Sequence, residues 1–377
     1  IDPNDFTFIC LLKACGSLRD LEGGNKMHIE AKKYNYGCDL FVGTSLIDMY
    51  AKCGSIILAK KAFDGLLERN VVSWTALLAA YAEHGQPERA LGFYDKMQDE
   101  SVSPDDRAFV IALQACYVLA EDEGSLGQDA LRRAQALHAN AWIKSLDSDV
   151  FVGNALVSLY GKCGKITEAE NVFARLPIRD IVSWNALLFA YVEDGWTHKA
   201  LRLFRQLKEE GVAPDDRTFV SSLQACVMLV ENDECSGFSA QSTKLIAVEV
   251  GRALHFESRI TGFDTNLYVS HTLVNLYSSC GTIAESENAF IRLREYSVVS
   301  WTVMCLAYLK QGEGVKTLQL YKEMQDEGVA PNDRAFTVAL QACCSLAEKE
   351  ATEGQPDKAI LHMIGKALHA DAQRIGF

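Results

Sequence analysis

Histidine and cysteine are the residues of this 377-residue chain whose side chains could bind a metal or act as nucleophiles. Two of the eight histidines stand in the pattern His-x-Glu, at His28 to Glu30 and at His255 to Glu257. A zinc-dependent deaminase combines this pattern with a downstream Pro-Cys-x-x-Cys, and no Cys-x-x-Cys pair occurs in the chain. The same histidine recurs at His138 and His369 without the glutamate. We therefore predict no catalytic residue, no metal site and no cofactor, and a structural role for the recurring histidine.

The twelve cysteines recur at fixed places instead of clustering. One set ends the motif KAC or QAC, and a second stands in KCG or SCG: Cys15, Cys116, Cys226 and Cys343, then Cys53, Cys163 and Cys280. A free cysteine behaves as a small buried apolar side chain. We interpret these cysteines as packing residues of a protein in a reducing compartment.

Three near-copies of one segment determine how any functional side chain must be positioned. They read VVSWTALLAAYAEHG at 71–85, IVSWNALLFAYVEDG at 181–195 and VVSWTVMCLAYLKQG at 298–312. They run on to SVSPD at 101–105, GVAPD at 211–215 and GVAPN at 328–332. Such periodic self-similarity is typical of solenoids, in which each repeat must stack on its neighbours to bury its apolar face.

Two further segment types alternate with this one. One opens as DRAFVIALQAC does at 106–116, and the other as VFVGNALVSLYGKCG does at 150–164. Together the three types divide the chain into ten predicted repeats: 5–39, 40–70, 71–105, 106–149, 150–180, 181–215, 216–266, 267–297, 298–332 and 333–377.

Each repeat is predicted to contain two helices. In 71–105, apolar residues spaced i, i+3, i+4 and i+7 form one helical face: Trp74, Leu77, Leu78 and Tyr81. Ser73 is predicted to cap the first helix, Gly85 to end it, and Pro87 to begin the second. We expect an all-α chain of roughly twenty helices. The sequence contains no run of about 18 apolar residues, so we predict no membrane-spanning helix.

The QAC repeats vary in length because of acidic insertions. Segments 121–129, 231–246 and 348–357 carry net charges of −4, −2 and −3. We expect them to be loops between the two helices of the repeat, since closing a longer loop costs little more free energy. The net charge of −13 disfavours nucleic-acid binding, whose usual signal is a basic surface. Most of this acidity lies outside the repeating framework, however.

This alternation of motifs resembles the pentatricopeptide repeat (PPR) proteins of the plant-organelle PLS subfamily, and the resemblance covers essentially the whole chain. It implies a right-handed α-solenoid superhelix of about ten stacked helix-turn-helix repeats in L-S-P triplets. The VVSW repeats resemble P repeats, the QAC repeats resemble L repeats, and the KCG or SCG repeats resemble S repeats. Family members read one RNA base per repeat with two or three side chains.

The resemblance also implies which residues read RNA. In the P and S repeats, the fifth and last residues contact one base edge, and the second residue packs against base faces. The implied pairs are Thr44 with Asn70 and Thr302 with Asn332 for adenine, Thr75 with Asp105 for guanine, and Asn154 with Asp180 and Asn185 with Asp215 for uracil. His271 with Ser297 departs from the family's usual pairs, and its base stays open. The second residues are Phe41, Val72, Phe151, Val182, Tyr268 and Val299.

The L repeats carry Ile9, Val110, Val220 and Thr337 at the fifth place, and the first three cannot make a polar base contact. Two interpretations of the last residues stay open, because Asn and Asp are also common helix caps. Base reading further requires that residues such as Asn154, Asn185 and Thr302 be neither on the outer wall nor buried away from solvent.

The function implied by the resemblance is sequence-specific binding of single-stranded RNA, as target recognition for C-to-U RNA editing. The implied footprint is 5′-A-G-x-U-U-x-x-A-x-3′. The resemblance also implies a mitochondrial or chloroplast location, a monomeric state, contacts with other RNA-editing proteins and no membrane partner. The chain opens on Ile1 and stops inside a repeat, so we expect an internal fragment, with any deaminase domain beyond Phe377. The alternative is a protein-binding helical scaffold, which the acidic charge favours.

Overall fold

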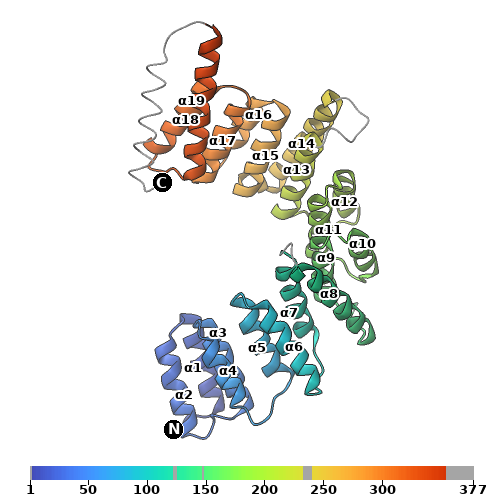
Figure 1. Cartoon of the computed structure of the whole chain (residues 1–377), viewed down its shortest axis with the longest axis vertical. Coiled ribbons are helices and arrows are strands. Elements are labelled where there is room, and N and C mark those ends of the chain that lie inside the picture. Colours follow the sequence, from blue (N-terminus) through green and yellow to red (C-terminus); the bar gives the residue numbers. More distant parts are fainter. Residues whose placement is uncertain (1, 122–124, 147, 232–239, 354–377) are drawn as a thin grey trace. The chain divides into compact units, whose positions relative to one another are not determined.

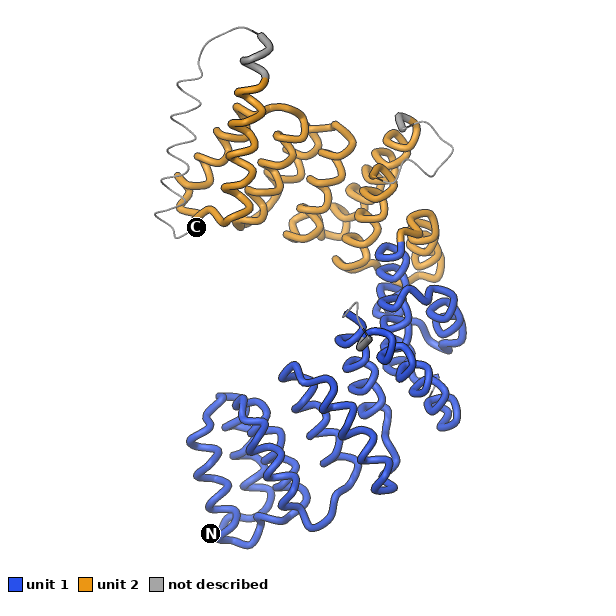
Figure 2. Tube along the Cα trace, viewed as in Figure 1, with its two compact units in different colours: residues 1–194 blue, residues 195–377 orange. Residues whose placement is uncertain are grey.

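The computed structural model describes residues 2–121, 125–146, 148–231 and 240–353. The chain divides into two compact units, residues 1–194 and 195–377 (Figure 2), and each is described by itself. All regular structure in the described ranges is helical, which confirms the predicted all-α class. The handedness of the predicted superhelix stays a prediction.

The N-terminal unit is a series of antiparallel helix pairs joined by short turns (Figure 1). Its helices are α1 (Asp5–Leu18), α2 (Leu21–Lys33), α3 (Leu40–Lys52), α4 (Ile56–Asp64), α5 (Val71–Glu83), α6 (Pro87–Asp99), α7 (Asp106–Leu119), α8 (Ser125–Ile143), α9 (Val150–Lys162), α10 (Ile166–Arg175) and α11 (Ile181–Glu193).

The C-terminal unit is built in the same way. It contains α12 (Thr197–Glu209), α13 (Asp216–Glu231), α14 (Ala240–Thr261), the short 3-10 helix η2 (Phe263–Thr265), α15 (Leu267–Cys280), α16 (Ile283–Ile291), α17 (Val298–Lys310), α18 (Gly314–Asp326) and α19 (Asp333–Glu353).

Odd-numbered helices are the first helices of the predicted repeats, and each begins where the sequence places the start of its repeat. Within the N-terminal unit, α1, α3, α5, α7, α9 and α11 pack against one another in that order. In the C-terminal unit, α13, α15, α17 and α19 do the same. Each unit is therefore a stack of helical hairpins, with α11 as the single last helix of the N-terminal unit and α12 as the single first helix of the C-terminal unit. The assignment of repeats to the L, S and P types stays a prediction.

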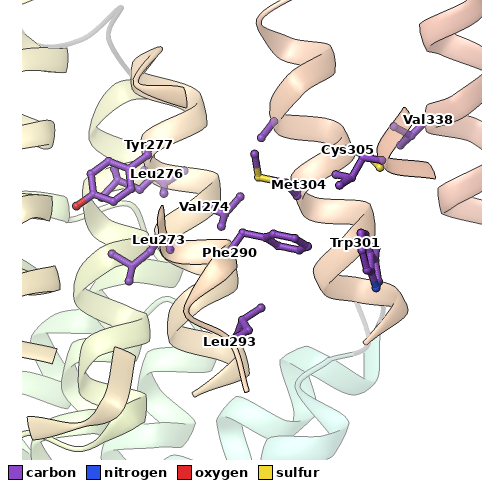
Figure 3. Packing of buried hydrophobic residues seen from close by; sticks show 14 of the residues in the cluster. Leu273, Val274, Leu276, Tyr277, Phe290, Leu293, Trp301, Met304, Cys305 and Val338 are labelled. Carbon is purple, nitrogen blue, oxygen red and sulfur yellow. The ribbon is translucent and has the colours of Figure 1, made fainter. Parts of the chain in front are cut away.

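Edge-to-face aromatic contacts hold neighbouring hairpins together. The buried Trp74 of α5 packs against Phe63 of α4 with ring centroids 4.7 Å apart, and Trp184 of α11 packs against Phe173 of α10 at 5.0 Å. Phe290 and Trp301 make the same contact at 5.4 Å in the C-terminal unit (Figure 3). Such pairs contribute about 0.5–1.5 kcal/mol each beyond the area they bury.

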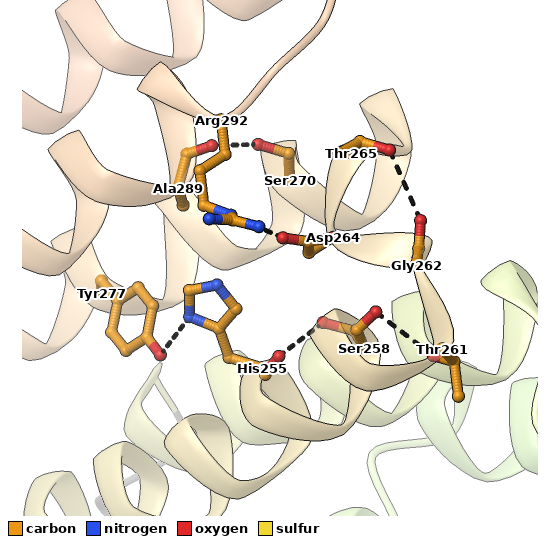
Figure 4. Close-up of polar contacts among 10 residues, drawn as sticks. All are labelled: His255, Ser258, Thr261, Gly262, Asp264, Thr265, Ser270, Tyr277, Ala289 and Arg292. Atoms are coloured by element: carbon orange, nitrogen blue, oxygen red, sulfur yellow. Dashed lines mark hydrogen bonds and ion pairs between the residues drawn. The ribbon is translucent and has the colours of Figure 1, made fainter.

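A small residue near the start of α3, α9 and α15 lets the second helix of the hairpin approach closely. A Cβ on Gly153 would lie 2.3 Å from Leu176 Cδ2, and one on Gly43 would lie 2.4 Å from Leu66 Cδ2. In α15 the residue is the buried Ser270, whose hydroxyl donates to Ala289 O at 2.8 Å (Figure 4). The FVG and YVS motifs are thus packing signals as well as the start of the repeat.

Helix boundaries in 71–105 agree with the sequence except at the first cap. The N-cap is Asn70, not Ser73, because Asn70 has extended backbone angles and its Oδ1 accepts from Ser73 N at 3.0 Å. Pro87 is the first residue of α6, as predicted. Gly85 follows the C-cap with φ of +66°, in the left-handed region that favours glycine.

The insertions of the QAC repeats are helical in part, which corrects the prediction that they are loops. Helices α8 and α14 have 19 and 22 residues, against 13 in α2. Helix α19 continues to Glu353, into the third acidic insertion, where Ala, Glu and Lys are good helix formers. Residues 122–124, 232–239 and 354–357 of these insertions lie outside the described residues.

The recurring histidine bonds a tyrosine on the next first helix. Nδ1 lies 2.8 Å from the tyrosine Oη in His28–Tyr50, 2.9 Å in His138–Tyr160 and 3.0 Å in His255–Tyr277 (Figure 4). These contacts confirm the structural role of three copies, and His369 lies outside the described residues. Within the described ranges, no group of three or more His, Cys, Asp or Glu side chains could hold a metal ion.

The QAC cysteines are packing residues, as predicted. Cys116, Cys226 and Cys343 are buried and Cys15 is partly buried. Burial raises the pKa of Cys116 and of Cys226 to about 12, so neither is a reactive thiolate at neutral pH. Across the part of the chain that the structure describes, no helix is both long and apolar enough to span a bilayer.

His28 makes stability depend on pH. Burial, helped by the nearby Lys32, lowers the pKa of His28 to about 4. Since an unfolded histidine has a pKa of about 6.5, the unfolded state binds more protons between these values. Stability contributed by the neutral ring is thus fully present above pH ~6.5 and decreases as the pH falls toward 4. The urea midpoint should fall from pH 7.5 to pH 5 by more in the wild type than in His28→Gln. Equal falls in the two proteins would contradict this assignment.

Candidate functional site

A row of exposed apolar side chains follows the starts of the first helices. It consists of the second residues of the S and P repeats: Phe41, Val72, Phe151, Val182, Tyr268 and Val299. Their exposed fractions lie between 48% and 71%, although valine and aromatic side chains are usually covered. Within each unit, the successive first helices are neighbours, so these residues line one face of the stack. A face of this kind suits a ligand with flat apolar surfaces.

The last residues of the P and S repeats are helix caps. Asn70, Asp105, Asp180, Asp215, Ser297 and Asn332 each accept a backbone N–H three residues ahead, at 2.8–3.2 Å. The capping interpretation is therefore correct for all six. Capping and base reading remain compatible for an amide or carboxylate, because the side chain has a second polar atom.

The fifth residues lie one turn inside the same helices. Thr44, Thr75 and Thr302 donate their hydroxyls to the backbone oxygens of Leu40, Val71 and Val298, at 2.7, 2.8 and 2.6 Å. This leaves the hydroxyl oxygen of each threonine as an acceptor.

Two of the predicted pairs come together in the N-terminal unit. Asn154 Nδ2 donates to Asp180 Oδ1 at 3.1 Å, and Thr75 Oγ1 lies 3.4 Å from Asp105 Oδ1. Asn185 and Asp215 belong to different units and are half-buried. Thr44, Asn70 and Asn332 are half-buried, and no hydrogen bond joins Thr44 to Asn70 or Thr302 to Asn332 in the described residues.

Asp180 is held as a carboxylate. Burial by itself raises the pKa of this carboxyl, but hydrogen bonds outweigh it and the net pKa is lowered. The Ser183 backbone N–H and hydroxyl donate to Asp180 Oδ1 at 2.8 and 2.9 Å, beside the bond from Asn154. An ionised Asp180 accepts only, so it fixes the amide of Asn154 with its nitrogen toward the carboxylate.

The Asn154–Asp180 pair lies in a hollow between α7, α9 and α11. The hollow is lined by Phe151 and Val182 of the exposed row, by Asn154 and Asp180, and by Val110 and Tyr117 of the preceding repeat. Asn154 Oδ1 is buried and has no hydrogen-bond partner. A buried acceptor without a partner is costly unless a ligand supplies a donor. The hollow thus presents an acceptor without a partner between two exposed apolar side chains.

Three fifth residues are buried, whereas base reading requires residues such as Asn154 and Thr302 to be accessible to a ligand. Asn154, Thr75 and Thr302 are 7%, 5% and 3% exposed. They lie one helical turn behind the cap residue, so neighbouring first helices cover them from both sides. A ligand reaches Asn154 only by entering the hollow. Base reading by these residues stays a prediction.

His271 has a different partner from the one the sequence analysis pairs it with. Its Nε2 lies 2.8 Å from Ser300 Oγ, and Ser300 in turn forms a capping box with Ser297. His271 is half-buried and lines a second hollow with Asn275, Lys310 and Arg334. The reasoning from sequence missed the third residue of the P repeats, Ser183 or Ser300, which bonds the predicted readers in both units.

Comparison with known families places these repeats. Residues 69–117, 179–228 and 297–345 match the PPR repeat family, and residues 44–71 and 154–181 match the PPR repeat. A chloroplastic pentatricopeptide repeat-containing protein of Arabidopsis thaliana is 34% identical over 93% of this chain and 53% of its own length. A mitochondrial one from the same plant is 30% identical over 88% of this chain and 30% of its own length.

Another chloroplastic relative from Arabidopsis thaliana is 32% identical over 91% of this chain, which covers 39% of that relative. The chain thus spans about half, or less, of the length of these relatives. Among solved structures, the crystal structure of the pentatricopeptide repeat protein PPR10 in complex with an 18-nt psaJ RNA element matches 98% of this chain and 64% of that one, with 16% identity and a TM-score of 0.43. The family matches cover more than half of the residues, and the chain belongs to the pentatricopeptide repeat family.

Proposed function

We propose that this chain binds single-stranded RNA sequence-specifically, with each P and S repeat reading one base. The observation that carries the proposal is the hollow at the Asn154–Asp180 pair, flanked by the exposed Phe151 and Val182. Apolar and aromatic side chains can pack on base faces, and stacking on an aromatic ring contributes about 1–3 kcal/mol per base. The polar pair between them would then discriminate by the donors and acceptors of the base edge.

The hydrogen bonds of Asn154 favour uracil at this repeat. Asp180 holds Asn154 Nδ2, so the free atom of the amide is the acceptor Oδ1. Uracil offers its N3–H to such an acceptor, whereas adenine and cytosine present a ring-nitrogen acceptor at that place. Guanine also has a ring N–H, but a purine is larger than the pyrimidine for which the longer asparagine leaves room. At the Thr75–Asp105 pair, the shorter threonine leaves more room, which favours the guanine predicted there.

We further propose the finer assignment to the PLS subfamily and to target recognition for C-to-U editing in a plant organelle. The alternation of the three segment types supports the subfamily. Relatives named as chloroplastic and mitochondrial support an organellar location. Other RNA-editing proteins are then the expected partners, and the deamination itself would be done elsewhere than in residues 1–377. We also propose the base-reading residues and the ten repeats with the positions given under Sequence analysis.

A reciprocal exchange within the N-terminal unit tests the base code. Asn154→Thr should change the preference at the fourth base of 5′-A-G-x-U-U-x-x-A-x-3′ from U to G, and Thr75→Asn should change the second base from G to U. Binding is measured by gel shift on RNAs carrying each base at these two positions, with at least a tenfold change in the ratio of affinities expected. Each variant serves as the control for the other position. Unchanged preferences in both variants, with affinity retained, would refute the code.

Variants of Asp180 separate capping from base reading. Asp180→Ser should keep the cap, as Ser297 caps α17, and so leave the free energy of unfolding within about 0.5 kcal/mol. It should nevertheless weaken the preference for U at the fourth base, because Asn154 loses its anchor. Asp180→Ala should lose both the helix cap and the anchor of Asn154, with a destabilisation of about 1 kcal/mol in urea unfolding. If Asp180→Ser leaves base preference intact, Asp180 only caps.

A protein-binding scaffold is the competing function, supported by the net charge of −13. The same gel shifts decide between the two. No binding to any RNA at low salt by a folded chain would exclude the RNA-binding proposal and favour the scaffold.

A further inference from the structure

The L repeats depart from the other repeats at the second residue. Three of the four carry arginine there, Arg107, Arg217 and Arg334, and the first carries Phe6. In the S and P repeats the same place is always apolar. Since the fifth residue of three L repeats is apolar, these repeats have no polar base reader of the kind found in the others. The arginine is therefore the feature of the L repeats that a bound RNA could contact.

All three arginines are exposed and unpaired. Their guanidinium groups form no ion pair, hydrogen bond or ring contact with any residue that the structure describes. The aspartate before each one, Asp106, Asp216 or Asp333, lies at the start of the same helix without bonding the guanidinium. Elsewhere in the described ranges, many exposed arginines, such as Arg133 and Arg252, pair with a carboxylate.

The arginines continue the exposed row. In the N-terminal unit, the second residues of successive first helices are Phe6, Phe41, Val72, Arg107, Phe151 and Val182. In the C-terminal unit they are Arg217, Tyr268, Val299 and Arg334. In the C-terminal unit, two apolar residues thus stand between Arg217 and Arg334, so its pair of base-reading repeats is bordered by a cationic side chain on each side.

The second hollow supplies an independent observation. Arg334 lines it together with Lys310 and the predicted reader His271. Lys310 Nζ contacts the neutral groups Asn275 Oδ1 and Ser279 Oγ at 3.3 Å, not a carboxylate. Two cationic groups and one carboxylate, Glu231, therefore border the place where the S repeat would hold its base, in a chain whose net charge is strongly negative.

We propose that Arg107, Arg217 and Arg334 bind phosphate groups of the RNA strand, so that the L repeats supply affinity without reading sequence. This inference rests on the proposed RNA binding. A guanidinium binds a phosphate with two parallel hydrogen bonds, and the first turn of a helix favours an anion. The acidic chain thereby places positive charge on the face that carries the base readers.

The salt dependence of binding measures phosphate contacts directly. For single strands, the slope of log K against log salt changes by about 0.7 per phosphate neutralised. The probe is a fluorescently labelled RNA of the predicted footprint with cytidine at the unassigned positions, and binding to the whole 377-residue chain is followed by anisotropy. Arg217→Gln combined with Arg334→Gln should reduce the magnitude of the slope by about 1.4, and adding Arg107→Gln should reduce it by about 2.

Three control arms make the result specific. Arg205→Gln removes an exposed arginine of α12, a second helix, that pairs with no residue in the described ranges, and it should leave the slope nearly unchanged. Replacing the row arginines by lysine keeps the charge and should keep most of the slope. Replacing them by phenylalanine, as in the first L repeat, should reduce the slope as glutamine does. Circular dichroism and urea midpoints confirm that each variant is folded.

The outcomes separate this inference from the proposed function. A slope equal to that of Arg205→Gln, with base preference at the fourth position retained, overturns phosphate binding and leaves the RNA-binding proposal standing. Phenylalanine variants that keep full affinity and slope overturn phosphate binding, and indicate that the row arginines stack on bases instead. A wild-type chain that binds no RNA overturns both.

Discussion

The packing of each first helix against the first helices before and after it is the constraint on which the rest of this protein depends. Trp74, Trp184 and Trp301 each contact the second helix of the preceding repeat, so these hairpins bury their apolar faces against one another. Because successive first helices start at equivalent residues and pack side by side, equivalent side chains within a unit fall into rows. The alignment of the exposed apolar residues, of the capped polar pairs and of the arginines follows from this packing.

The cap residues link stability to the proposed recognition. Asp180 begins α11, anchors Asn154 and lines the hollow, and a lowered pKa keeps it ionised. A residue that only capped would tolerate serine, asparagine or aspartate freely, since these cap almost equally well. The proposed function gives the choice among them a meaning, because aspartate and asparagine present different second polar atoms to the hollow and serine presents none. Under the proposed function, the polar pairs would select bases, the apolar residues would pack on base faces, and the arginines would bind the phosphates of the strand.

Much of the fold was predictable because it is written three or four times. Three alternating motifs placed the starts of ten first helices, and Pro87 marked a second helix correctly. Local cues failed where two residues compete: Ser73 looks like a cap, yet Asn70 has the extended backbone that a cap needs. Polarity alone suggested loops in the insertions, although Ala, Glu and Lys there extend α19. The burial of Asn154 and the bond from His271 to Ser300 were not predictable, because both depend on how neighbouring helices pack. His271 and Ser300, for example, are 29 residues apart in the sequence.

Photo-crosslinking tests the central claim that the face of the first helices receives the RNA. An RNA of the predicted footprint with 4-thiouridine at the fourth position is bound, irradiated and digested with the protein, and the crosslinked peptide is identified by mass spectrometry. Our account predicts a crosslink within α9 or at the start of α11, close to Phe151, Asn154 or Val182. A crosslink confined to the second helices α8 and α10 would contradict it.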